Sequence, residues 1–275
     1  QMCIRDRFHA TSAATALATR LAAKIKTATP TLSMLSVRGM MVHSAKWTPE
    51  MIRIGNIKDI IPLCGYGVPD EETALFSNEK YATFIFENEL IPYWEKDGSN
   101  TYNQLHFYDL PWPTEVLEQM GEENVKIRIT LSYYVKPSPG YAGRSNKYRY
   151  PSATLHFDLK SASESMEEFL CRRNKSEGEK RTDNDTNRWT IKQQRREQGT
   201  VQSDWIECTA AELASCGQII VYPGQGWWKE RKLANVDNVI KYSLIVSIET
   251  TKTEIYDAVE TAISNRIGVQ IMQEV

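Results

Sequence analysis

The sequence lacks several features that would assign a function directly. Its five cysteines form no Cys-x-x-Cys pair, the usual mark of a zinc or thiol-redox site, and we expect no metal and no cofactor. No apolar run approaches the roughly 20 residues that a membrane-spanning helix needs, so we expect no membrane partner. The net charge of the 275 residues is only −2, which gives no sign of a nucleic-acid partner. These absences leave an ordinary globular chain.

The cysteines are Cys3, Cys64, Cys171, Cys208 and Cys216. Their number is odd, and neither Cys208 nor Cys216 has a histidine partner at a spacing typical of zinc sites. Buried free thiols in a reducing compartment fit this pattern best. We therefore expect a cytoplasmic protein without a disulfide framework.

Basic residues gather in two short runs, at 172–175 and 192–196. Acidic residues are interleaved with both. This mixture is typical of a solvated surface, and it is a weaker match to a nucleic-acid patch.

The segment Thr11-Ser12-Ala13-Ala14-Thr15 opens an alanine-rich helix that continues to about Ala23. Ser12 would lie in its first turn, where unpaired backbone N–H groups and the helix dipole favour an anion. A serine nucleophile of acyl transfer needs this setting, because the attacked carbonyl becomes an oxyanion. An ordinary hydroxyl N-cap is the other interpretation of the same residues.

The residues that follow favour the first interpretation. Small residues all around the helix indicate close packing inside a larger body. Thr29-Pro30 predicts the start of a second helix, which would run to about Ala45. Beyond it, the segment Gly65-Tyr66-Gly67 indicates a glycine turn.

These segments, in this order, resemble the nucleophile region of subtilisin-like serine peptidases, the subtilases. Later stretches also fit a bacterial subgroup of that family with a β-rich C-terminal extension, namely Val125–Tyr134, Tyr148–Ser152 and Gly226–Lys229. The resemblance implies a serine endopeptidase in which Ser12 is the nucleophile. It also implies that the backbone N–H of Ser12 contributes to the oxyanion hole.

The family order of the catalytic triad is Asp, His, Ser. With the serine at position 12, the Asp and His would precede this sequence, so we expect the C-terminal part of a larger peptidase, inactive alone. The implied partners are a protein or peptide substrate, the upstream part of its own catalytic domain, and a partner ATPase.

The N-terminus departs from the family pattern. Ala10 stands where the family usually has glycine, and the run Met2–Arg7 resembles a translated sequencing adapter. We expect residues 1–7 to be artefactual and residues 1–78 to be the end of the catalytic domain.

A complete triad within this chain would need one of four histidines, His9, His43, His106 or His156. His43 ends the expected second helix, His156 lies in an expected strand, and His9 belongs to the doubtful terminus. We expect structural histidines at positions 43 and 156, because a catalytic base must meet strict geometry.

From Lys80 onward the hydrophobic period changes to two residues, which predicts β-strands. The clearest alternation runs from Val125 to Val135. The other expected strands are 81–86, 103–108, 153–159, 200–205, 218–222 and 242–248. Since each strand would bury one face, two antiparallel sheets must pack together.

The predicted class is therefore α+β: the C-terminal helices of a subtilisin-like α/β domain, then a jelly-roll-like antiparallel β-sandwich over 79–275. One helix interrupts the strands, with Ser161-x-x-Glu164 as its capping box. The polar stretch near 174–188 is expected to be a mobile loop.

A non-catalytic interaction module, or a carbohydrate-binding sandwich, is the alternative function. The pair Trp227-Trp228 follows a glycine turn, and exposed paired aromatics can stack on sugars. A role as a plug of the sandwich core is the favoured interpretation of this pair.

Overall fold

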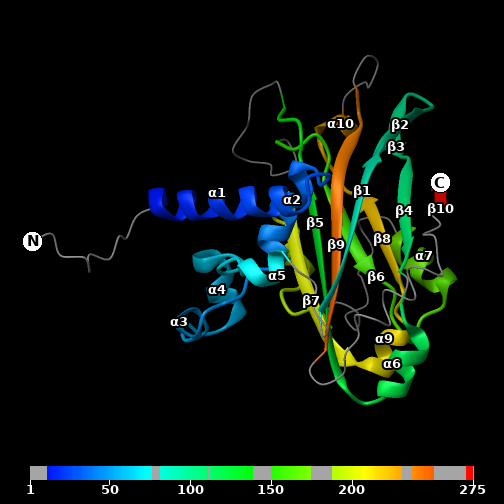
Figure 1. Cartoon of the computed structure of the whole chain (residues 1–275). Coiled ribbons are helices and arrows are strands. Elements are labelled where there is room, and N and C mark those ends of the chain that lie inside the picture. The colour runs from blue at the N-terminus through cyan, green and yellow to red at the C-terminus, as the bar shows by residue number, and fades with distance from the viewer. Residues whose placement is uncertain are drawn as a thin grey trace, which may run out of the picture. The chain divides into compact units, whose positions relative to one another are not determined.

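A computed structural model describes residues 11–75, 81–110, 112–138, 150–174, 188–230, 237–250 and 271–274. The chain divides into two compact units, Gln1–Phe76 and Ser77–Val275. The described part of the first unit is helical, and the second consists mainly of antiparallel strands (Figure 1). Helices and antiparallel sheets together give the α+β class that the sequence predicts.

The first unit holds five helices among its described residues: α1 (Thr11–Ala28), α2 (Met34–His43), α3 (Pro49–Ile52), α4 (Ile57–Cys64) and α5 (Glu71–Leu75). The prediction that Thr29-Pro30 begins the second helix is wrong. The N–H of Thr29 donates to the Ile25 carbonyl, which closes α1, and Ser33 caps α2 by accepting from the Ser36 N–H. Pro30 therefore follows a helix end, where its missing N–H costs nothing.

The core of this unit is small. Leu21 and Ile25 of α1 and Val37 and Met40 of α2 are buried, whereas Met34, the first residue of α2, is 58% exposed. The turn after α4 depends on Gly67, which has φ +100° and lies so close to Lys46 that a Cβ would be 2.3 Å from that carbonyl oxygen.

The second unit contains two four-stranded antiparallel sheets and one hairpin. The first sheet has the order β1 (Tyr81–Leu90), β9 (Ile240–Thr250), β5 (Asn124–Tyr133), β7 (Val201–Thr209). The second has the order β10 (Ile271–Glu274), β4 (Gln104–Asp109), β8 (Gln218–Pro223), β6 (Leu155–Leu159). The hairpin pairs β2 (Tyr93–Lys96) with β3 (Ser99–Tyr102). Apart from that hairpin, successive strands alternate between the two sheets.

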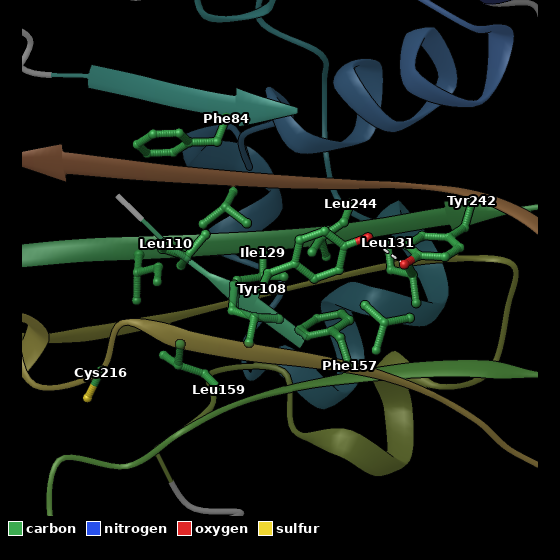
Figure 2. Packing of buried hydrophobic residues seen from close by; sticks show 14 of the residues in the cluster. Phe84, Tyr108, Leu110, Ile129, Leu131, Phe157, Leu159, Cys216, Tyr242 and Leu244 are labelled. Atoms are coloured by element: carbon green, nitrogen blue, oxygen red, sulfur yellow. Dashed lines mark hydrogen bonds between the residues drawn. The ribbon is translucent and has the colours of Figure 1, made fainter. Parts of the chain in front are cut away.

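Both sheets contribute to one hydrophobic core. Its members include Ile129 of β5 and Leu244 of β9 from one sheet, and Phe157 of β6 and Val221 of β8 from the other. Figure 2 shows these layers with Ile129, Leu244 and Phe157 directed into the space between the strands. Burial of each large apolar side chain contributes about 1.5–3 kcal/mol, so this core is the main source of the unit's stability.

All seven strands expected from the period-two pattern are present, with ends shifted by a few residues. The hairpin β2–β3 and the strand β10 were not predicted. The hairpin strands are four residues each and mostly polar, so they carry no clear alternation.

The expectation that each strand buries only one face is wrong for β5. Arg128, Thr130 and Ser132, on the face opposite the core, are buried as well. Their polar groups are paired across the sheet: Arg128 Nε donates to Ser203 Oγ at 3.1 Å, and Thr130 Oγ1 lies 2.8 Å from the same oxygen. Hydrogen bonds to β7 thus compensate the burial of these side chains.

Five helices join the strands among the described residues: α6 (Thr114–Met120), α7 (Met166–Asn174), α8 (Gln193–Arg196), α9 (Ala210–Ala214) and α10 (Trp227–Glu230). The capping box of α7 was placed one turn too early. The helix begins after Ser165, which exchanges hydrogen bonds with Glu168, whereas the Glu164 carboxylate accepts from the Ser161 N–H in the turn before it. The expected loop near 174–188 lies almost wholly outside the described residues, as do residues 1–10.

Candidate active site

Ser12 lies in the first turn of the described α1, and its side chain is exposed. The next hydroxyls along the helix are paired with its backbone: Thr15 Oγ1 donates to the Thr11 carbonyl at 2.9 Å and Thr19 Oγ1 to the Thr15 carbonyl at 2.8 Å. The Ser12 hydroxyl makes no hydrogen bond with any other described residue. It is therefore accessible, at the end of the helix where the dipole is positive.

α1 is anchored at its other end. Leu21 and Ile25 are its buried residues. Lys24 forms an ion pair and a hydrogen bond with Glu71 of α5, and this contact lowers the pKa of the Glu71 carboxyl. The N-terminal half is exposed, including Leu17 at 64%. The close packing expected around the small residues of α1 is not supplied by the described residues, and Figure 1 shows this half extending away from the other helices of the unit.

The turn beside α2 is held by charge and backbone pairing. Lys46 pairs with Val68 through two backbone hydrogen bonds of 2.9 Å, and its Nζ lies 3.0 Å from Asp70 Oδ2. Burial of Asp70 opposes ionisation, but hydrogen bonds from Thr73 and Lys46 outweigh it and lower the pKa of the carboxyl. Asp70 then serves as a negatively charged cap before α5.

Among the described residues of its unit, Ser12 has no base within reach. His43 ends α2 and is 1% exposed, whereas Ser12 is exposed and makes no hydrogen bond with it. His9 lies outside the described residues. Because an unactivated serine hydroxyl is a weak nucleophile, the described residues of this unit do not form a working catalytic pair.

Of the two histidines in the second unit, His106 is built into the core. Its Nδ1 lies 2.6 Å from the Tyr242 hydroxyl, which in turn contacts the Tyr108 hydroxyl (Figure 2). Its Nε2 is buried and finds no hydrogen-bond partner among the described residues. Burial lowers the pKa of His106 and raises the pKa values of Tyr108 and Tyr242, so the cluster is neutral.

The tryptophan pair does not offer two free faces. Trp228 is 1% exposed and belongs to the core, and Trp227 donates its indole N–H to the Lys136 carbonyl at 3.1 Å. The two rings meet edge to face with centroids 5.9 Å apart. This geometry is that of a core plug and gives no support to a sugar-stacking platform at this pair.

Other candidate groups remain separate or unreactive. Among the described residues there is no cluster of three or more potential metal ligands, and no helix there is both long and apolar enough to span a bilayer. The described cysteines Cys64, Cys208 and Cys216 are free. Burial raises the pKa of the Cys208 thiol to about 12, which keeps it protonated.

A buried charge pair escaped the sequence analysis. Arg196, expected in a solvated basic run, is 2% exposed and lies 3.7 Å from Asp204, which is fully buried. Asp204 accepts from the N–H groups of Ile191, Lys192 and Trp205, yet burial still raises its pKa. The burial of Arg196 could not be predicted, because a run of charged residues does not indicate which of its members turns inward.

The comparison with protein families agrees with the resemblance of the N-terminal helices. Residues 5–82, just over a quarter of the chain, match the model of the subtilase family. No curated protein and no solved structure matches the chain at comparable significance. The matched segment contains Ser12 and ends at the start of β1. Residues 5–82 of this chain are therefore similar to the subtilase family of serine peptidases.

Proposed function

We propose that the intact protein is a serine endopeptidase of the subtilase type, and that Ser12 is its nucleophile. The observation that carries the proposal is the family match over residues 5–82, combined with the exposed hydroxyl of Ser12 in the first turn of α1. Residues 83–275 lie outside the family match, in keeping with an extension to a peptidase domain.

The chemistry would proceed in two stages. Ser12 Oγ attacks the carbonyl carbon of a peptide bond while a histidine takes its proton, and the oxyanion is stabilised by N–H donors that include the backbone of Ser12. The C–N bond then breaks as the amine takes that proton, and water releases the acyl group. The N-terminal position of Ser12 on α1 supports this role, since the helix dipole favours the developing negative charge.

The histidine and its orienting aspartate are proposed to come from an upstream part of the same catalytic domain, since the described residues give Ser12 no base. Residues 1–78 would then be the end of that domain, and 79–275 an extension that stabilises it or recruits protein substrates. A partner ATPase and a cytoplasmic location are further proposals. The first is supported by the resemblance alone, and the second by the free thiols.

Labelling with a fluorophosphonate probe tests the proposal. The gene product should be prepared with its upstream sequence, beside the 275-residue chain. We expect the longer protein to be labelled, and the label to map to the peptide that carries Ser12. The shorter chain should label at least about 100-fold more slowly, because it has no activated serine.

Two variants make the test specific. Ser12→Ala should abolish labelling of the longer protein, whereas Thr19→Ala, which removes another exposed hydroxyl from α1, should leave it unchanged. A folded longer protein that does not label, or that labels elsewhere, would refute the role of Ser12 and leave the binding-module alternative.

A further inference from the structure

A second cluster of polar side chains surrounds His156, far along the sequence from Ser12. His156 lies on β6 with its side chain 14% exposed, on the opposite face of the strand from the core residue Phe157. The ring packs against Tyr222 of β8, with centroids 5.5 Å apart. Gly224 closes against it so tightly that a Cβ there would lie 2.3 Å from His156 Nε2. The imidazole is therefore held in one orientation.

One ring nitrogen faces a hydroxyl that has a choice of acceptors. His156 Nε2 lies 3.2 Å from Thr154 Oγ1, and the same oxygen lies 3.1 Å from the Gln225 carbonyl. A hydroxyl has one hydrogen, so it can donate to the carbonyl or to the ring, but not to both. When it donates to Gln225, its lone pairs face Nε2, and that nitrogen must carry a hydrogen.

The other ring nitrogen faces a carboxylate. His156 Nδ1 lies 3.3 Å from Glu197 Oε1, in the turn that follows α8, and the Glu197 side chain is 19% exposed. The two atoms are within ion-pairing distance but not aligned as a hydrogen bond. The contact therefore depends on charge, and it is strongest when the ring is an imidazolium.

Glu197 lies near a second cationic group, but that group is shared with another acid. Arg196 Nη2 is 3.9 Å from Glu197 Oε1, but the same guanidinium is already neutralised by Asp204 of β7 at 3.7 Å. Asp158, two residues along β6 on the side of His156, is a second buried acid, and Tyr222 is the titratable group of β8. Two acids besides Asp204 thus share this region, which favours a positive ring.

We infer that His156 is a proton-dependent clasp. The protonated ring would bind Glu197 through Nδ1 and donate to Thr154 through Nε2, while the Thr154 hydroxyl secures the Gln225 carbonyl. Loss of the Nε2 proton would remove the ion pair and turn the Thr154 hydroxyl from Gln225 to the ring. The clasp therefore joins β6 to the turn after α8 and to the loop that precedes α10, and it tightens as the pH falls.

A double-mutant cycle at two pH values tests the clasp. The full chain, with His156→Gln, Glu197→Gln and both changes, is unfolded in urea at pH about 5.5 and about 8. Tryptophan fluorescence is the signal, and six of the seven tryptophans lie in the second unit. We expect the coupling between the two side chains, as a ratio of unfolding constants, to be at least about fivefold larger at the lower pH.

The matched control is the exposed pair Lys241 and Glu89, 2.8 Å apart, which contains no histidine. Its coupling should be the same at both pH values. Nitrogen-15 NMR of the wild-type imidazole gives an independent readout, with both ring nitrogens protonated at pH about 5.5. Equal His156–Glu197 coupling at both pH values, or a ring with a single proton at the lower pH, would overturn the inference, and the NMR readout holds even if a variant fails to fold.

Discussion

At the scale of single residues, His106 shows that a sequence can place a side chain in a strand without predicting its contacts. Its position in a strand could be predicted, because the alternation through 103–108 is clear. Its contact with Tyr242 could not, since His106 and Tyr108 lie on β4 of one sheet and Tyr242 lies on β9 of the other. The pairing of distant residues is decided by topology.

Burial of His106 leads to a prediction about pH. Because burial lowers its pKa, the ring is neutral in the folded chain, while the unfolded chain takes up a proton below about pH 6.5. The free energy of unfolding should therefore decrease as the pH is lowered from about 7 to about 5, by up to roughly 1.4 kcal/mol per pH unit. His106→Gln should reduce this slope, measured by urea unfolding at several pH values.

The control for that slope is Asn88→Ala, which removes the outer member of the same cluster, 3.4 Å from the Tyr108 hydroxyl, without removing a titrating group. It should lower stability but leave the slope as in the wild type. His156 is inferred to stabilise the fold more at low pH, which opposes the effect of His106. The informative quantity is therefore the difference in slope between each variant and the wild type. An unchanged slope in His106→Gln would show that His106 does not contribute.

At the scale of elements, the short helix α9 depends on its cap. Thr209 Oγ1 accepts from the Glu212 N–H at 3.3 Å, and the Glu212 carboxylate accepts from the Thr209 N–H at 3.2 Å. A helix of five residues has too few internal hydrogen bonds to hold itself, so these two matter more than in a long helix. The cap also fixes Ala210 and Leu213, both fully buried.

Thr209→Ala should destabilise the second unit by about 1 kcal/mol, because the Glu212 N–H loses its acceptor. Thr209→Ser keeps the oxygen and should change stability by less than about half of that. Urea unfolding followed by tryptophan fluorescence measures both. If the two variants were equally destabilised, the loss would come from the methyl group and not from the cap.

Another element-scale feature is the edge of β6. Gln202 Nε2 donates to the Leu155 carbonyl at 2.7 Å, Arg196 Nη2 to the Phe157 carbonyl at 3.2 Å, and Arg188 to the Leu159 carbonyl. Side chains from the 188–202 segment thus satisfy the carbonyls that an edge strand leaves unpaired. This arrangement protects β6 from pairing with another chain.

At the scale of the whole molecule, the two units differ in how well they cover their apolar residues. Within the described ranges, nine large hydrophobic side chains are exposed, and six of them lie in the first unit: Leu17, Met34, Ile52, Ile54, Leu63 and Val68. A peptidase segment separated from the rest of its domain would leave such residues uncovered. The second unit has a continuous core and the features of an independently stable body.

Limited trypsin digestion should reveal the difference in local stability between the two units. We expect the first unit and the bond after Lys80 to be cleaved earlier than any bond within the strands of the two sheets, because cleavage needs local unfolding and the sheets resist it. Intact mass and N-terminal sequencing identify the cleaved bonds. Cleavage within β5 or β9 as early as in α1 would contradict this expectation.

The sequence alone determined the class, the likeness of the N-terminal helices to the subtilase family and the seven longest strands. Each of these depends on a local pattern: a helix opening, a motif or a period of two. Only the tertiary structure decided which polar side chains turn inward. Arg196 and Asp204 meet from different elements, Arg128 is buried beside Ser203, and His156 lies between Thr154 and Glu197. Such contacts join residues far apart in the chain, and their energy depends on burial that no local pattern encodes.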